Sequence, residues 1–263
     1  MSESVPQVGR RPGEGARVAL IDSGVDGSHP WFAAALLRHV RVERTGDAFG
    51  VVPDEGGDQS GHGTACAGII HRVAPGALVT SVRALGPDGR CSRAALLAAL
   101  EHCVRERYAV VNLSLGIDVP RKATLGPADQ RPILALYELA DAAATAGVVL
   151  VAAGPNVAAF RTYPGRFKSL VGVGRNCCHN LDGLQTARTA DHEILAPGTD
   201  ILAPALGGGE RRWTGTSFAC PVVAGHIARI VAERPGLPVE SVKAALHALA
   251  AAAEARRREE PKP

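Results

Sequence analysis

Short apolar runs alternate along this chain with longer segments in which apolar residues recur at helical spacing. The runs have the continuous apolar character of strands buried on both faces, and they are ARVALID (16–22), ALVTSVRAL (77–85), AVVNLSLG (109–116), VVLVAAG (148–154) and SLVGVG (169–174). The helical segments are 61–73, 92–108, 133–147, 216–236 and 239–258. This alternation predicts an α/β fold, a three-layer sandwich in which helices cover both faces of a mostly parallel sheet.

The alternation continues along the chain without an interdomain linker or an internal repeat. We expect one domain over residues 16–253, preceded by a flexible, polar arm (1–15) and followed by a charged tail (254–263). The polar stretch 116–132 is expected to be a surface loop, because the alternation resumes after it.

The charge balance argues against nucleic acid and membranes as partners. The chain has 29 basic and 26 acidic residues, a net charge of +3 that is too small for an electrostatic binding surface. No apolar run reaches the roughly 18 residues of a membrane span. The first residues, MSESVPQVGRRPGEGAR, lack the apolar stretch of a secretory signal, so we expect a cytoplasmic location.

Six cysteines are expected to be reduced thiols, because the domain is large and carries no export signal. They are Cys66, Cys91, Cys103, Cys177, Cys178 and Cys220. Cys177, Cys178 and His179 are adjacent, which raises the question of a metal site. Zinc sites, however, usually separate paired cysteines by two to four residues and need a second pair. We therefore expect no metal there.

Three glycine-flanked motifs carry groups suited to nucleophilic catalysis. Asp22 ends the first strand in ALIDSGVDGSHP, His62 opens a helix in SGHGTACAG, and Ser217 opens another in GTSFACPVVAG. Taken singly, Asp22 could be a helix cap or a metal ligand, His62 a structural histidine, and Thr216 or Ser217 a helix cap. Together they supply a nucleophile, its base and a carboxylate that orients the base, in the chain order Asp, His, Ser.

These motifs resemble those of the subtilisin-like serine peptidases, the subtilases. The resemblance extends from Ala16 to Pro235 and includes four shorter segments, NLSLG (112–116), VAAGPN (151–156), TYPGRF (162–167) and LAPG (195–198). It implies a parallel sheet of about seven strands and a serine endopeptidase that hydrolyses peptide bonds through an acyl-enzyme.

By this resemblance, Ser217 is the nucleophile, His62 the general base and then acid, and Asp22 the residue that orients His62. The Asn156 side chain is expected to donate to the oxyanion beside the backbone N–H of Ser217. The family usually reads A-A-G-N, whereas Pro155 intervenes here. The alternative is that Pro155 and Asn156 form a turn with no catalytic part.

The resemblance also places residues around an extended peptide. Those that would pair with the substrate backbone or form the opposite wall are Ser114, Leu115, Gly116, Gly89 and Cys91. Those expected around the pocket for the residue before the scissile bond are Ala152, Ala153, Gly154 and, near its floor, Thr162. None of these is charged, so we expect an uncharged side chain in that pocket.

No cofactor is expected. The family's common calcium loop is missing, because HRVAPGAL (71–78) passes directly to the next strand, so a chelator should leave activity and melting temperature nearly unchanged. We expect a monomer acting on a peptide or protein substrate. Two alternatives are a dedicated peptidase that matures a biosynthetic precursor peptide, and a pseudo-peptidase that binds extended peptides without cutting them.

Overall fold

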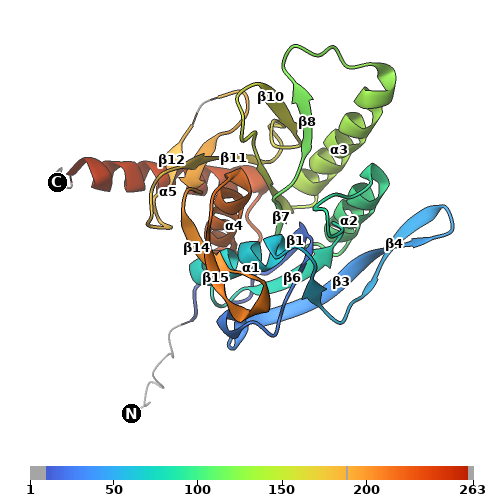
Figure 1. Cartoon of the computed structure of the whole chain (residues 1–263). Coiled ribbons are helices and arrows are strands. Elements are labelled where there is room, and N and C mark those ends of the chain that lie inside the picture. The colour runs from blue at the N-terminus through green and yellow to red at the C-terminus, as the bar shows by residue number, and fades with distance from the viewer. Residues whose placement is uncertain (1–9, 188, 260–263) are drawn as a thin grey trace.

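A nine-stranded sheet forms the middle layer of the protein in a computed structural model that describes residues 10–187 and 189–259 (Figure 1). Its strand order is β12-β13-β11-β9-β7-β1-β6-β3-β4. The strands are β1 (Arg17–Asp22), β3 (Leu36–Thr45), β4 (Ala48–Pro53), β6 (Leu78–Arg83), β7 (Val110–Leu113), β9 (Val149–Ala153), β11 (Val171–Asn176), β12 (Gln185–Thr186) and β13 (Ile194–Pro197). The seven strands from β13 to β3 are parallel, and only the edge strands β12 and β4 pair antiparallel. The predicted fold class is confirmed.

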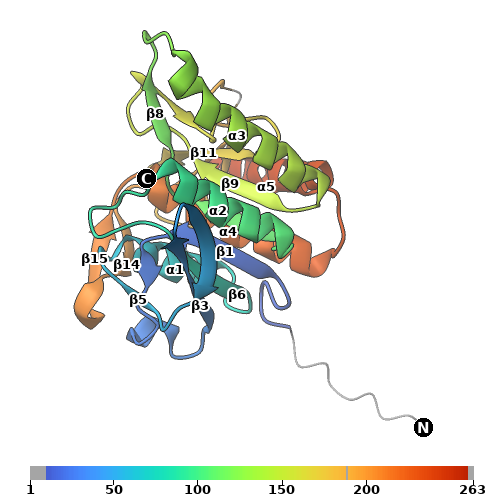
Figure 2. The same cartoon turned by 90° about the vertical axis from the view of Figure 1, so that its right-hand side faces the viewer.

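Five helices cover the two faces of the sheet. They are α1 (His62–Val73), α2 (Arg93–Arg105), α3 (Pro127–Thr145), α4 (Thr216–Glu233) and α5 (Val239–Glu259). Helices α2 and α3 lie side by side on one face, and α1, α4 and α5 cover the other (Figure 2). No helix in the described ranges has the length and apolar character needed to cross a bilayer.

The strand β1 shows why an unbroken apolar run forms a central strand. Val18 and Leu20 point into the core beneath α1 and α4, whereas Ala19 and Ile21 point into the core beneath α2 and α3. All four are completely buried. Because both faces of the strand are covered, every position from Val18 to Ile21 is apolar, and Asp22 ends the strand.

The loop expected over 116–132 is more ordered than the sequence indicated. It contains β8 (Ile117–Pro120), which pairs antiparallel with β10 (Phe160–Tyr163). Helix α3 begins at Pro127 rather than near residue 133, with Gly126 as its N-cap. Proline is favoured in the first turn of a helix because its missing N–H has no intrahelical partner there. The expectation of a loop up to residue 132 is therefore wrong.

The packed structure extends past the expected C-terminal boundary of the domain. Helix α5 continues past residue 253 to Glu259, and Glu254 accepts a hydrogen bond from the Thr186 hydroxyl at 2.9 Å. The charged tail thus begins as packed helix, and residues 260–263 lie outside the described residues. So do residues 1–9 of the expected N-terminal arm.

Two further short strand pairs and two 3₁₀ turns complete the fold. Strand β2 (Gly24–Val25) pairs with β5 (Gly57–Asp58), and β14 (Ile201–Pro204) pairs with β15 (Glu210–Trp213). The 3₁₀ turns are η1 (Pro30–Phe32) and η2 (Leu206–Gly208). All six cysteines are unpaired, in agreement with the expectation of free thiols.

Candidate active site

A cleft of about 550 Å³ opens where β7 and β9 end and where α1 and α4 begin. His62 is the first residue of α1 and Ser217 the second residue of α4, and both line the cleft. The carboxyl edge of a parallel sheet collects strand-end residues and helix N-termini in one place. Sequence segments more than a hundred residues apart therefore meet there.

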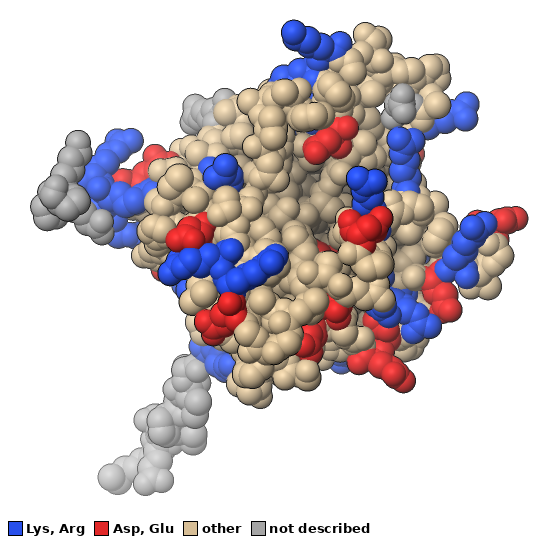
Figure 3. Space-filling model, in the orientation of Figure 1, with Lys and Arg blue, Asp and Glu red and all other residues tan. Residues whose placement is uncertain are grey.

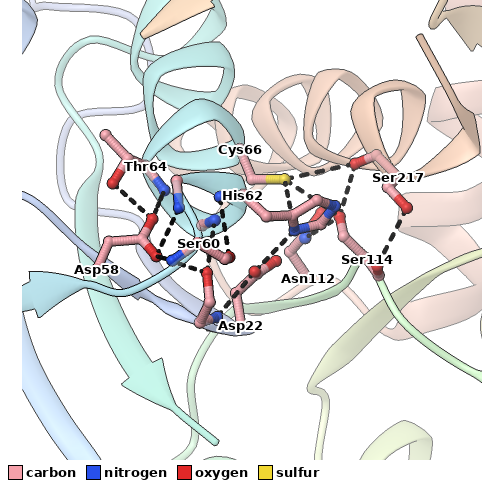
Figure 4. A network of polar contacts seen from close by, with 12 residues as sticks. Asp22, Asp58, Ser60, His62, Thr64, Cys66, Asn112, Ser114 and Ser217 are labelled. Carbon is pink, nitrogen blue, oxygen red and sulfur yellow. Dashed lines mark hydrogen bonds and ion pairs between the residues drawn. The ribbon is translucent and has the colours of Figure 1, made fainter. Parts of the chain in front are cut away.

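Asp22 and His62 form a buried pair beside this cleft (Figure 4). The His62 Nδ1 lies 2.8 Å from Asp22 Oδ1, and the Asp22 side chain is only 1% exposed. The same carboxylate oxygen accepts the Ser23 backbone N–H at 2.8 Å. The carboxylate fixes the orientation of the imidazole, which leaves Nε2 as the nitrogen free to act in the cleft.

Two neighbours act on the protonation of His62. Burial lowers the pKa of His62, but the facing Cys66 sulfur and the Asp22 carboxylate oppose this effect and raise it above its ordinary value. The Cys66 Sγ lies 3.9 Å from His62 Nδ1 (Figure 4). Burial raises the pKa of the Cys66 thiol, which favours its neutral form. Asp22 is therefore the charged neighbour that stabilises the imidazolium.

Asp58 holds the loop that presents His62. Helix α1 has Gly61 as its N-cap, which offers no side-chain cap. The Asp58 carboxylate serves in place of a side-chain cap, because it accepts the backbone N–H of Gly61 at 3.0 Å and that of Thr64 at 2.8 Å. It also accepts the Ser23 hydroxyl at 2.8 Å, which ties the start of α1 to the segment after Asp22. Burial acts to raise the pKa of Asp58, but its hydrogen bonds to Thr64 and Ser23 help to lower it below 3.8.

We expect Asp58→Asn to reduce the free energy of unfolding at pH 7 by about 2–3 kcal/mol, because an amide group then faces buried donors. Because the pKa of Asp58 in the folded protein lies below 3.8, the stabilisation by its charged carboxylate is fully present above pH 3.8. It is lost as the pH falls through the folded-state pKa of Asp58. The gap between wild type and variant should therefore narrow below pH 3.8. Urea unfolding at pH 7 and pH 3 measures this, with Asp47→Asn, on an exposed turn, as the control. An equal gap at both pH values would contradict the assignment.

Ser217 stands in the first turn of α4 with its hydroxyl directed toward the preceding strand ends. The N-cap of α4 is Gly215, so the expectation that Thr216 or Ser217 caps this helix is wrong. The Thr216 hydroxyl donates to the Gly154 carbonyl at 2.8 Å, and the Ser217 hydroxyl donates to the Ser114 carbonyl at 3.2 Å. Gly215 occupies the N-cap position with a φ of +154°, which glycine adopts readily. Neither the Thr216 nor the Ser217 hydroxyl therefore serves as the helix cap.

A buried network supports the turn that carries Ser217. The Ser114 hydroxyl donates to the Ser217 carbonyl oxygen at 2.7 Å and accepts from Asn112 Nδ2 at 2.9 Å (Figure 4). Among the described residues, no hydrogen bond joins the Ser217 hydroxyl to His62. Catalytic hydrogen bonds are often long or misaligned without substrate, and rotation of the Ser217 side chain away from Ser114 would redirect its hydroxyl.

Asn156 lies on the cleft despite the intervening Pro155. The backbone N–H of Thr216 donates to Asn156 Oδ1 at 2.9 Å, which anchors the amide oxygen to the start of α4. The NH₂ group is then the part of the amide that remains to donate into the cleft, and Asn156 lines it.

Most residues expected around the substrate line this cleft. They are Gly89, Ser114, Leu115, Gly116, Ala153, Gly154 and Thr162. Two do not. Ala152 is completely buried in the core beneath α2 and α3, because neighbouring residues of a strand point to opposite faces and Ala153 takes the cleft side. Cys91 packs against that same core instead of lining the cleft.

Several cleft residues were not expected from the sequence. They are Ser60, Leu85, Pro87, Asp88, Asp118, Arg211, Trp213 and Thr216. Arg211 stacks over the Trp213 ring at 3.4 Å from its centroid. Asp118 alternates with the buried Val119 along β8, a strand pattern that was hidden inside a polar stretch. Only the pairing of β8 with β10 brings Asp118 to the cleft.

The structure offers one three-residue group for a metal in the part of the chain it describes. Ligand atoms of Asp22, His62 and Cys66 lie within 4.8 Å of one another. Asp22 and His62 already share a hydrogen bond. Outside this group, the Cys177 sulfur faces Thr199 at 3.8 Å, whereas the Cys178 sulfur accepts from Arg257 at 2.7 Å, so the adjacent thiols have different partners.

Comparisons with known proteins agree with this architecture. A family model for the subtilases matches residues 13–260. The chain is 30% identical to subtilisin E of Bacillus subtilis (strain 168) over 240 residues, which cover 85% of this chain and 57% of that protein. It is 32% identical to subtilisin BL of Lederbergia lenta over 235 residues, covering 85% and 78%. A cold-adapted subtilisin-like serine proteinase has a TM-score of 0.69 and 26% identity, covering 90% and 83%.

The fold, the cleft and these matches define a subtilase, and the chain belongs to the subtilase family. It spans less than two thirds of the length of subtilisin E.

Proposed function

We propose that this protein is a serine endopeptidase. The observation that carries the proposal is the 2.8 Å contact between Asp22 and His62 at the cleft that Ser217 also lines. Nucleophile, base and orienting carboxylate are the parts that acyl transfer at neutral pH requires. Membership of the subtilase family supports this chemistry.

In the proposed mechanism, the Ser217 Oγ attacks the scissile carbonyl carbon while its proton passes to His62 Nε2. Asp22 stabilises the imidazolium that forms. Collapse of the tetrahedral intermediate breaks the C–N bond, and His62 gives the proton to the leaving amine. Water then attacks the acyl-enzyme with His62 again as the base, which releases the acid and restores Ser217.

We assign Asn156 Nδ2 and the Ser217 backbone N–H as donors to the oxyanion. Ser217 lies in the first turn of α4, where backbone N–H groups lack intrahelical partners and the helix dipole favours negative charge. The Thr216–Asn156 hydrogen bond holds the amide in place before the reaction. A preorganised donor stabilises the charge that develops in the transition state more than the neutral carbonyl.

Asn156→Ala is expected to lower kcat by about 10²–10³-fold with little change in KM, the range measured when the amide donor of subtilisin itself is removed. The fold should persist, because Asn156 is exposed on a loop. Steady-state kinetics with a chromogenic peptide, and the melting temperature as a control, measure this. A kcat within about threefold of wild type would reject Asn156 as an oxyanion donor.

We further propose that the substrate is a peptide or protein segment bound as an extended strand. Ser114, Leu115 and Gly116 form one edge of the cleft and Gly89 lies on another, which suits backbone pairing on both sides of a peptide. The six unpaired cysteines support a reducing compartment, so we propose a cytoplasmic location.

Digestion of an unfolded protein such as reduced casein tests this function. We expect cleavage at many sites, mapped by mass spectrometry, and none with Ser217→Ala. Cleavage at one site of one precursor peptide would instead indicate a dedicated maturation peptidase. Binding of extended peptides without cleavage would indicate a pseudo-peptidase.

A further inference from the structure

A carboxylate lies in the part of the cleft where the sequence indicated only uncharged groups. Asp118 on β8 stands opposite Thr162 on β10 in the antiparallel register, and the Thr162 hydroxyl donates to Asp118 Oδ1 at 2.6 Å. Both residues line the same cleft as Ser217. Thr162 is buried, whereas Asp118 is exposed to the solvent that fills the cleft.

A peptide bound along this cleft would place the side chain that precedes its scissile bond at this end. The segments that lead to it are Ser114–Gly116 on one side and Ala153–Gly154 on the other, and both reach Ser217 or its helix through hydrogen bonds. A peptide that pairs with Ser114–Gly116 and places its carbonyl at Asn156 directs the preceding side chain between these two segments. The β8–β10 pair closes the pocket between them.

The Asp118 carboxylate has no cationic partner among the residues that the structure describes. Two basic side chains near this pair are engaged elsewhere: Arg161, next to Thr162, donates to the Ala123 carbonyl at 2.9 Å, and Arg121 pairs with Asp191. Arg166 also faces Asp191, at 3.5 Å. Thr162 engages one oxygen, so the other can accept from a ligand.

The remaining charges of the cleft lie on other segments. Asp88 accepts from the Arg90 backbone N–H at 3.1 Å, and Arg211 stacks over Trp213. Figure 3 shows separate acidic and basic side chains around the central hollow rather than a patch of one sign. The carboxylate in the pocket itself is that of Asp118.

We propose that Asp118 selects an arginine or lysine side chain immediately before the scissile bond. This specificity rests on the proposed endopeptidase function. A carboxylate that Thr162 holds in place and that lacks a cation of its own favours a guanidinium or ammonium group through a charge-assisted hydrogen bond. The electrostatic attraction between the Asp118 carboxylate and this cationic side chain is stronger in a peptide-filled cleft than in open water, because the bound substrate excludes solvent.

Peptides that differ only at this position test the proposal, with arginine, lysine, leucine or citrulline, the uncharged isostere of arginine. We expect kcat/KM for arginine to exceed that for citrulline about 10- to 100-fold in wild type. Asp118→Asn should bring the two within about threefold. Asp47→Asn, which removes the same charge from an exposed turn, should keep the wild-type ratio.

A binding measurement separates this proposal from the proposed catalysis. Benzamidine, a small cation, should bind the Ser217→Ala chain in a calorimeter, and Asp118→Asn in that background should weaken binding at least tenfold, with melting temperatures checking the fold. Three results would overturn the proposed specificity. One is efficient cleavage with a preference for leucine, and another is an arginine-to-citrulline ratio of kcat/KM that Asp118→Asn leaves unchanged. The third is benzamidine binding that is equally strong with and without the Asp118 carboxylate. No cleavage by wild type, with Asp118-dependent benzamidine binding retained, would overturn the endopeptidase function and leave the pocket's charge selection supported.

Discussion

Ser217→Ala is expected to lower kcat by about 10⁶-fold, the size of the loss measured for the nucleophile of subtilisin, a relative of this chain. The alanine methyl group cannot form the acyl-enzyme, and only substrate positioning and the oxyanion donors remain. KM should change little, because the proposed peptide contacts of Ser114, Leu115 and Gly116, which line the cleft, are unaltered. Single-turnover kinetics with a peptide ester reach rates this low.

A double variant sharpens this expectation. His62→Ala should cost about as much as Ser217→Ala, and the two together should cost no more than either alone, because each group works only through the other. Losses that multiply in the double variant would mean that the two residues act independently. Residual activity of Ser217→Ala above about 1% of wild type would contradict its role as nucleophile.

Asp22→Asn is expected to lower kcat by about 10⁴-fold at neutral pH. An amide in place of the carboxylate lets His62 adopt the wrong tautomer and leaves the imidazolium without its charged partner. Since Asp22 raises the pKa of His62, wild-type activity should rise as the pH increases through that raised value. In Asp22→Asn the acidic limb of the pH–activity profile should move to lower pH, because the negative charge that stabilises the protonated His62 is gone.

The matched control is Asp26→Asn, which removes a carboxylate from the same loop. Asp26 accepts hydrogen bonds from Ser28 and has no contact with His62 among its described interactions. Its kcat should stay within about twofold of wild type. An Asp22→Asn enzyme with near wild-type kcat, or with an unmoved acidic limb, would show that Asp22 does not orient and charge-stabilise His62.

The sequence was most informative where one physical requirement governs each position. In β1 both faces are buried, so Val18 to Ile21 are all apolar and the strand and its terminal Asp22 could be placed. Glycines around Asp22, His62 and Ser217 indicated places where two backbone segments lie very close together. At Gly63 an added Cβ would lie 2.1 Å from the Gly24 carbonyl oxygen, which only glycine avoids.

The sequence was least informative where tertiary pairing decides the structure. Strand β8 is only four residues long, and its exposed Asp118 looked like part of a polar loop until β10 paired with it. The sequence also did not show which face of its strand each cleft residue occupies. Ala152 and Ala153 are the same residue type, and only the pleat of β9 sends one into the core and the other to the cleft.

The most direct test of the account is covalent labelling with a fluorophosphonate. An activated Ser217 displaces fluoride from phosphorus and forms a P–O bond, while its proton passes to His62. We predict one adduct per chain on Ser217 by intact-mass and peptide mass spectrometry, and no adduct in Ser217→Ala or His62→Ala. A folded wild-type protein, verified by its melting transition, that remains unlabelled at Ser217 would contradict the assignment of Asp22, His62 and Ser217 as a catalytic triad.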